Sequence, residues 1–291
     1  MSNIDFIYDW TKDGLRLQGI HWEEKTMGTC VLFIHGTSGN IIENYFAHTL
    51  GRELSNNGYG FFYGHNRGYS HINDIKNNQG NHSRIGARYE KFSECLYDID
   101  LWVNKIIELG YEKIIIMGHS LGANKTIYYN SKEQNQNIVG LILGSPPDLV
   151  GLTKLKDQFR NEMINEARDN LKKNEPNKIL SHLHEGWFEV SSETYLEFSI
   201  DGCAADNLPI LRNPDRFEEL DKIKVPILAF MGDTDEVNIN SPEEDLLLLK
   251  TKATNCPDFQ YKILDGANHN YIDKEKELSD LVVSWIKQAF K

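Results

Sequence analysis

Five short runs of consecutive apolar residues constrain the fold of this chain more than any other feature. The runs lie at 30–34, 59–63, 114–117, 138–143 and 227–231, and a further strand is expected at 259–264. Strands that are apolar without alternation are typical of sheets covered on both faces, and such sheets are mostly parallel. These runs therefore predict a buried, mostly parallel sheet.

Helical patterns separate the runs. Segments 43–57, 89–109 and 278–290 carry apolar residues at the spacing of one helix face. Before them, alternating apolar residues from Ile4 and again from Leu15 flank an Asp-Gly turn, which is typical of a hairpin. The order strand, helix, strand predicts an α/β fold with a mostly parallel central sheet and helices on both faces.

The alternation stops between 149 and 216. This segment is rich in charge and in helical patterns but has no convincing buried strand. Because structureless loops beyond about 15 residues are uncommon in a compact domain, we expect an inserted helical segment over the sheet edge. The predicted core domain then consists of 1–148 and 217–291.

Composition excludes some classes of function. Asp and Glu outnumber Lys and Arg by 43 to 31, for a net charge of −12, and such a surface repels the phosphates of nucleic acids. No run approaches the roughly 18 apolar residues of a membrane-spanning helix, and no leader pattern opens the sequence. The four scattered cysteines form no C-x-x-C pair. We expect a cytoplasmic protein with free thiols, and its oligomeric state stays open.

The strongest chemical signal is Gly118-His119-Ser120-Leu121-Gly122, which follows a buried strand and precedes a helical pattern. In this context the pattern G-x-S-x-G forms a sharp turn that exposes the serine hydroxyl beside a helix N-terminus. Ser120 is therefore the candidate nucleophile.

A serine nucleophile needs a base and a carboxylate that orients the base. His269 follows the strand at 259–264, and Asp235 follows the strand at 227–231. Parallel sheets present their sites at these carboxyl ends. Asp233 and Glu236 compete with Asp235 as the acid.

The third element is His35-Gly36-Thr37-Ser38-Gly39-Asn40, directly after the first buried strand. The backbone amides of Thr37 and Leu121 are candidates for an oxyanion hole, which stabilises the charge of a tetrahedral intermediate. The alternative is that Gly36 and Gly39 serve only as turn residues.

These motifs together resemble the α/β-hydrolase superfamily, and the resemblance covers nearly the whole chain. The matching stretches are Gly118 to Gly122, His35-Gly36, Gly232-x-x-Asp235 and Gly266-x-x-His269. Because that family places its acid three residues after the glycine, the resemblance favours Asp235 over Asp233. It also implies that 149–216 is a helical cap. The chain departs from the family at His65-Asn66-Arg67-Gly68, where many members have Asp-x-Arg-Gly.

The resemblance implies a cofactor-independent serine hydrolase that cleaves a small carboxylic ester or thioester through an acyl-enzyme on Ser120. A serine at this position argues against a dehalogenase, whose chemistry uses a carboxylate. Two alternatives stay open. One is an acyltransferase or cyclising thioesterase, in which an amine or alcohol captures the acyl group. The other is a binding protein without catalysis.

Two weaker patterns lie in the insertion. The aromatic side chains of Trp187, Phe188, Tyr195 and Phe198 are candidates to line a substrate pocket, or else pack the cap against the core. His182 and His184 stand two residues apart, and that spacing alone is weak evidence for a metal. We predict no metal site.

Overall fold

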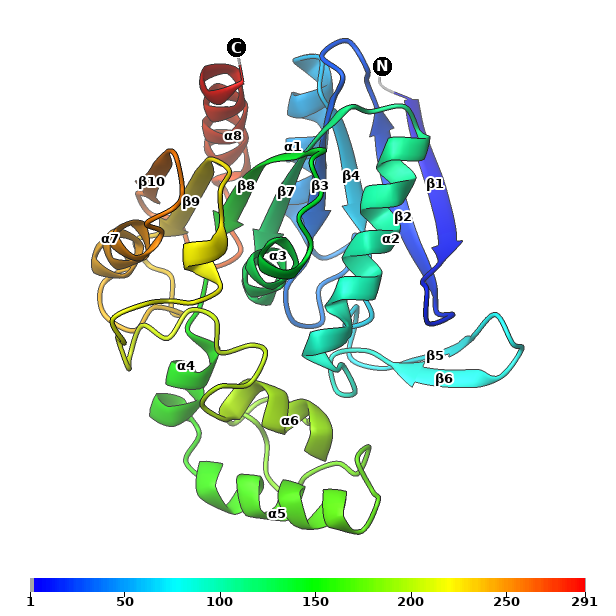
Figure 1. Cartoon of the computed structure of the whole chain (residues 1–291), viewed down its shortest axis with the longest axis vertical. Helices are drawn as coiled ribbons and strands as arrows, with labels where there is room; N and C mark the ends of the chain where they lie inside the picture. The colour runs from blue at the N-terminus through cyan, green and yellow to red at the C-terminus, as the bar shows by residue number, and fades with distance from the viewer. Residues whose placement is uncertain (1–2, 291) are drawn as a thin grey trace.

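A central sheet organises the computed structural model, which describes residues 3–290 (Figure 1). Its strands are β1 (Asn3–Trp10), β2 (Arg16–Glu23), β3 (Thr29–Ile34), β4 (Gly60–Gly64), β7 (Lys113–His119), β8 (Ile138–Gly144), β9 (Ile227–Gly232) and β10 (Phe259–Leu264). They lie in the order β1-β2-β4-β3-β7-β8-β9-β10. The β1–β2 and β2–β4 pairs are antiparallel, and all the other pairs are parallel. The predicted mostly parallel sheet is confirmed.

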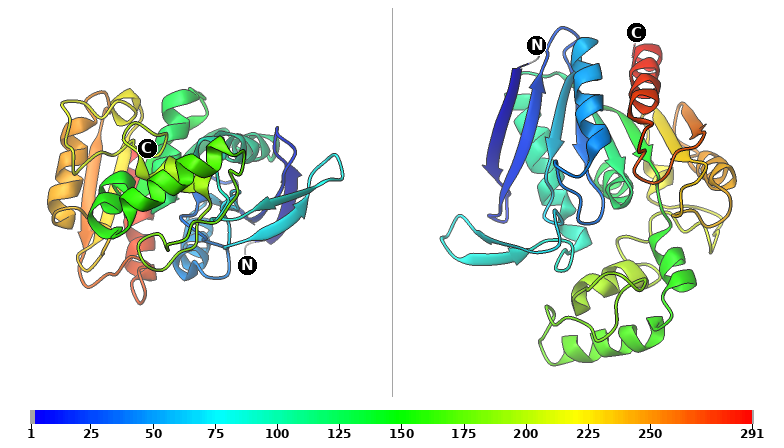
Figure 2. Two further views of the ribbon diagram at one scale, coloured as in Figure 1. Left: turned by 90° about the horizontal axis from the view of Figure 1, so that it is seen from below. Right: turned by 180° about the vertical axis from the view of Figure 1, so that it is seen from behind.

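Helices cover both faces of this sheet. They are α1 (Tyr45–Asn56), α2 (Cys95–Glu108), α3 (Leu121–Lys132), α7 (Pro242–Lys252) and α8 (Glu275–Ala289). Side chains of β3 alternate between two cores, with Leu32 in the core under α2, α3 and α7 and Phe33 in the core under α1 and α8. Figure 2 shows α1 and α8 in front when the molecule is seen from behind. The apolar runs are continuous because each face of the sheet is buried.

Two local features differ from the sequence-based expectation. The helix expected from residue 89 begins only at Cys95, after the short 3-10 turn η1 (Phe92–Glu94), and the chain is still extended at Lys91. A hairpin of β5 (Asn73–Lys76) and β6 (His82–Ile85) also projects from the core (Figure 1). This hairpin is largely exposed, so its sequence carries little of the apolar alternation by which strands are recognised.

The inserted segment lies between β8 and β9, beyond one end of the sheet (Figure 1). It contains α4 (Leu149–Lys156), α5 (Arg160–Lys172) and α6 (Ser192–Ser199). Met163, Ala167 and Val190 belong to a small apolar cluster that lies mostly within the segment and also includes Ala87. The segment thus buries part of its apolar surface internally and leaves another part for a cavity beside the sheet.

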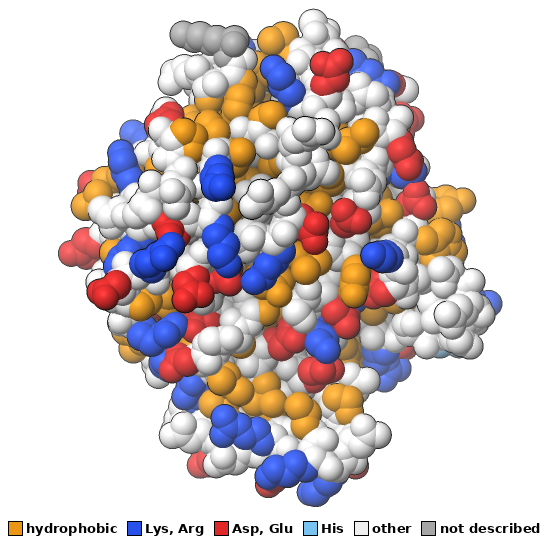
Figure 3. All heavy atoms as spheres, viewed as in Figure 1, with side chains coloured by type: hydrophobic (Ala, Val, Ile, Leu, Met, Phe, Trp, Pro, Cys, Tyr) orange, Lys and Arg blue, Asp and Glu red, His pale blue; other side chains and the backbone are white. Residues whose placement is uncertain are grey.

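The surface in Figure 3 carries acidic and basic side chains interspersed on the face that is seen there. The net charge of −12 is therefore not gathered into one patch on that face. Among residues 3–290, no helix is both long and apolar enough to cross a membrane.

Candidate active site

Ser120 occupies a strained turn between β7 and α3. Its backbone has φ 55° and ψ −130°, in a region that non-glycine residues rarely adopt. The turn is tight, because a Cβ atom added at Gly118 would lie 2.2 Å from the backbone oxygen of Gly122. The Ser120 amide donates to the Gly144 carbonyl at 2.9 Å, which ties the turn to β8. Strain held in place by packing is common where a side chain must be presented for chemistry.

The side chains of His269 and Asp235 meet beside this turn. His269 Nδ1 lies 3.0 Å from Asp235 Oδ1, and the Asp235 side chain is fully buried. Burial by itself raises the pKa of Asp235, but hydrogen bonds from His269, Ser145 and the Val237 amide hold this pKa below its ordinary value. The carboxylate is therefore charged at neutral pH. An Nδ1–H donor toward Asp235 leaves Nε2 of His269 free to accept a proton.

The competing acids lie elsewhere. Asp233 and Glu236 are exposed, and within residues 3–290 neither side chain contacts His269. Glu236 lines the cavity described below. Only Asp235, of the three acids weighed from the sequence, is brought to the imidazole.

Ser145 and Tyr271 support Asp235, and sequence reasoning missed both. Ser145 Oγ donates to Asp235 Oδ2 at 2.5 Å and lies 2.5 Å from Tyr271 Oη, so the tyrosine hydroxyl donates to the serine. Both residues are buried. A signal was present in the sequence, because Ser145 directly follows β8 and so stands at the same carboxyl edge as the other site residues.

His119, the variable residue of the G-x-S-x-G pattern, positions the His269 loop. Its Nε2–H donates to the His269 carbonyl oxygen at 2.8 Å, and the two rings lie 4.8 Å apart. Burial lowers the pKa of His119 to about 3, so its ring is neutral. His119 thus fixes the backbone of the candidate base without adding charge.

Ser120 and His269 line the same cavity, although among residues 3–290 no hydrogen bond joins Ser120 Oγ to the His269 ring. Such bonds are often long in unliganded enzymes and shorten when substrate binds. The arrangement is therefore compatible with transfer of the serine proton to His269.

Two backbone amides border the cavity without a partner. In the part of the chain that the structure describes, neither the Thr37 amide nor the Leu121 amide donates a hydrogen bond, and both residues line the cavity. Gly36 brings the Thr37 loop close to the nucleophile, because a Cβ atom added there would lie 2.8 Å from Ser120 Cβ. An oxyanion is stabilised by amides that are free to donate to it beside the nucleophile, and these two amides lie beside the candidate nucleophile.

His35 clamps this loop. Its Nδ1–H donates to the Gly36 carbonyl at 2.8 Å, and its Nε2 accepts from the Asn66 amide at 3.0 Å. Burial keeps the pKa of His35 well below its ordinary value, so both contacts use the neutral ring. The sequence placed His35 in the motif, but only the fold shows that Asn66 is its partner.

The cavity measures about 700 Å³, within the usual range of small-molecule sites. Trp187, Phe188 and Phe198 line it, as do Leu149 and Leu152. Tyr195 lies outside the lining, because it is fully buried in the insertion and its hydroxyl donates to Asp157. Three of the four aromatic residues considered for a pocket thus face one.

The two histidines of the insertion point to different partners. His184 contacts Asp157, and His182 contacts Glu162. Among residues 3–290, no three His, Cys, Asp or Glu side chains gather as a metal would require. The two histidines therefore do not share a partner.

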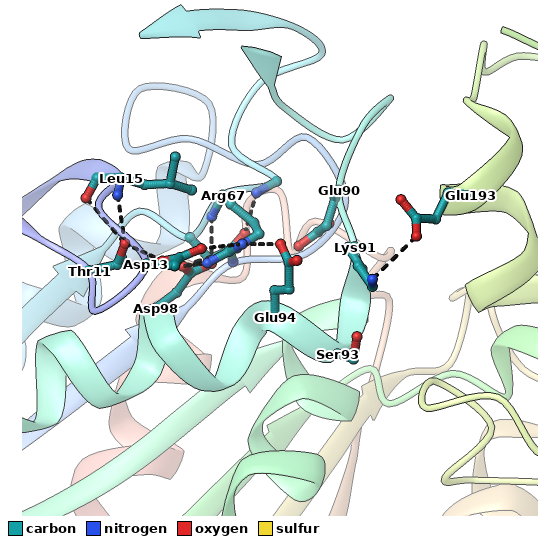
Figure 4. A network of polar contacts seen from close by, with 12 residues as sticks. Thr11, Asp13, Leu15, Arg67, Glu90, Lys91, Ser93, Glu94, Asp98 and Glu193 are labelled. Atoms are coloured by element: carbon teal, nitrogen blue, oxygen red, sulfur yellow. Dashed lines mark hydrogen bonds and ion pairs between the residues drawn. The ribbon is translucent and has the colours of Figure 1, made fainter. Parts of the chain in front are cut away.

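A charged network lies under the nucleophile helix. Arg67 is buried among Asp98, Glu94 and Asp13 (Figure 4). Lys125, on α3, forms a fully buried ion pair with Glu90 and also donates to Asn66 Oδ1 at 3.0 Å. Since Asn66 in turn contacts His35, this network connects α3 to the loop of the Thr37 amide.

Lys125→Met is expected to lower the free energy of unfolding by about 3–5 kcal/mol, because it leaves the Glu90 carboxylate buried without a counter-charge. Urea unfolding measures this change. The double variant Lys125→Met with Glu90→Leu is the control, and it should regain most of the loss since both charges are gone. A single variant as stable as the native protein would contradict the prediction.

The chain has the α/β-hydrolase fold. The structure resembles that of DcsB, solved in complex with its substrate analogue, with a TM-score of 0.71, 13% identity and 99% of each chain covered. It also resembles Est1E from Butyrivibrio proteoclasticus (TM-score 0.63, 18% identity, 98% of each chain). A third similar structure is the Pyrococcus furiosus esterase Pf2001 (TM-score 0.62, 14% identity, 100% of this chain and 94% of the other). At these identities the likeness establishes the fold.

A family model described as "Protein of unknown function (DUF1749)" matches residues 98–291, about two thirds of the sequence. The chain belongs to this family. The search of curated proteins found no match.

Proposed function

We propose that this protein is a serine hydrolase that cleaves a carboxylic ester or thioester through an acyl-enzyme on Ser120. One observation carries the proposal: His269, the strained Ser120 turn and two amides without a partner in residues 3–290 border one cavity, and the buried Asp235 carboxylate contacts the His269 ring. These are the parts of a serine hydrolase site, and they come from four separate segments of the chain.

In the proposed reaction, Ser120 Oγ attacks the acyl carbon while His269 Nε2 takes the hydroxyl proton. Asp235 holds the ring with Nδ1–H toward itself and stabilises the imidazolium. The Thr37 and Leu121 amides donate to the oxyanion. His269 then gives its proton to the leaving group, and it next activates the water that releases the acid.

The inserted segment 149–216 acts in this proposal as a cap. Its residues Leu149, Leu152, Trp187, Phe188 and Phe198 form an apolar wall of the cavity that holds Ser120. An apolar wall of this kind suits the hydrocarbon part of an ester and limits the access of water.

A fluorophosphonate probe tests the proposal. We expect the folded protein to be labelled, and peptide mass spectrometry to place the label on Ser120 alone, because only an activated serine reacts. Heat-denatured protein is the control and should not be labelled. Labelling at another serine, or none in the folded protein, would overturn the assignment.

Hydrolysis rates of p-nitrophenyl esters of increasing chain length then identify the substrate class. Product analysis with an added alcohol or amine distinguishes hydrolysis from acyl transfer, since both share the same acyl-enzyme. Free acid as the sole product supports the proposed hydrolysis, whereas new esters or amides would favour transfer.

A further inference from the structure

A second pair of histidine and carboxylate lies in the cap, and its histidine borders the cavity. His184 Nδ1 lies 2.8 Å from Asp157 Oδ2. The Asp157 side chain is 1% exposed and that of His184 is 15% exposed. His184 lines the cavity together with Ser120 and His269. The proposed reaction uses neither member of the cap pair.

The contacts of Asp157 fix the tautomer of His184. Asp157 also accepts hydrogen bonds from the Tyr195 hydroxyl at 2.8 Å and from the Glu185 amide. Burial by itself raises the pKa of Asp157, but the hydrogen bonds from His184, Glu185 and Tyr195 hold this pKa below its ordinary value. A charged carboxylate has no proton to donate, so Nδ1 of His184 carries the hydrogen.

In the neutral ring, Nε2 of His184 is then left as an acceptor. Within residues 3–290 it has no hydrogen-bond partner, and it is an accessible atom on a ring that lines the cavity. The residues that line the cavity close to His184 in the chain are Glu185, Trp187 and Phe188. An acceptor held in a fixed orientation beside apolar side chains favours a ligand that places a donor opposite it.

We propose that His184 Nε2 accepts a hydrogen bond from a substrate hydroxyl group remote from the scissile bond. The inference rests on the proposed function and deepens it: the preferred substrate is a hydroxylated ester or thioester. A carboxylate in this position has no proton to donate, and it would meet Glu43, Glu185 and Glu236 in the same cavity. An ammonium group would lose more hydration at the apolar wall than a hydroxyl group does.

His184→Asn is the deciding variant. The asparagine Nδ2 stands where the histidine has Nδ1, so donation to Asp157 and the cap network are kept while the Nε2 acceptor is removed. His184→Gln is the matched rescue, because its longer side chain places an amide oxygen near the position of Nε2. Any effect confined to His184→Asn therefore reports on the acceptor rather than on cap packing.

The first measurement is kinetic. ω-Hydroxyacyl p-nitrophenyl esters are compared with plain esters of equal length, and monoesters of diols with esters of simple alcohols. The two sets distinguish a hydroxyl in the acyl part from one in the alcohol part. The native enzyme should prefer the hydroxylated member of one set by about tenfold in kcat/KM, His184→Asn should lose that preference, and plain esters should change little. An equal loss on both members would overturn the inference.

The second measurement does not need turnover. Isothermal titration of the Ser120→Ala protein with matched hydroxylated and plain amides, which resist hydrolysis, should show about tenfold tighter binding of the hydroxylated member, lost on adding His184→Asn. If the native protein hydrolysed no ester while this binding preference was present, the proposed function would be refuted and the hydrogen bond from a ligand hydroxyl to His184 would still stand. Equal binding of both amides would refute the inference whatever the kinetics show.

Discussion

Ser120→Ala is expected to lower kcat for a p-nitrophenyl ester by about 10⁵–10⁶-fold while the protein stays folded. Members of a catalytic triad act as a unit, so losing the nucleophile costs nearly as much as losing the whole triad. The residual rate would come from the cavity and the Thr37 and Leu121 amides. Steady-state kinetics measures the loss, and thermal unfolding checks the fold.

Ser38→Ala is the matched control. Ser38 also lines the cavity and also has a positive φ, of 52°. The control therefore removes the hydroxyl of another serine of the same cavity whose backbone is similarly strained. Its kcat should stay within about tenfold of the native value, since its side chain has no assigned step. Full activity in Ser120→Ala would mean that the nucleophile lies elsewhere.

Asp235→Asn is expected to reduce kcat by about 10⁴-fold. An asparagine amide can turn a donor toward His269 Nδ1, which favours the wrong tautomer and removes the charge that stabilises the imidazolium. The site is buried, and Ser145 and Val237 already donate to the same carboxylate, so water cannot take over its role. Ester kinetics with active-site titration measures the effect.

Asp233→Asn is the control for this second prediction. It makes the same change two residues away, at an exposed side chain, and should alter kcat by less than about twofold. A larger loss in Asp233→Asn than in Asp235→Asn would reverse the assignment of the acid.

The pH dependence follows from the direction of the Asp235 shift. Its folded-state pKa lies below the ordinary value, so the contribution of this carboxylate to stability is present above about pH 4 and is lost as pH falls through the folded-state pKa. In Asp235→Asn this acid-side dependence should be weaker, and the stability of native and variant proteins should converge as the pH falls.

The sheet and the turn at Ser120 were predictable because their signals are local. Uninterrupted apolar runs such as 30–34 indicate strands that are buried on both faces, as in a parallel sheet covered by helices. Gly118 and Gly122, on either side of Ser120, indicate a turn with no room for a Cβ atom at these two positions. The position of Asp235 and His269 after late strands also follows from chain order, since parallel strands share one carboxyl edge.

Contacts between polar groups far apart in the chain needed the tertiary structure. Nothing in the sequence around Lys125 indicates its burial against Glu90, because a lysine on a helix is ordinarily solvated. The same holds for Ser145 and Tyr271 behind Asp235.

Segment 149–216 shows most directly what the sequence could not decide. The sequence predicted helices in 149–216 and placed aromatic residues there, since periodicity and composition are properties of neighbouring residues. Only the packing of α6 decided that Tyr195 turns inward to Asp157 while Phe198 faces the cavity. Side chains on one short helix have similar local signals, and their orientation depends on which surfaces surround the helix.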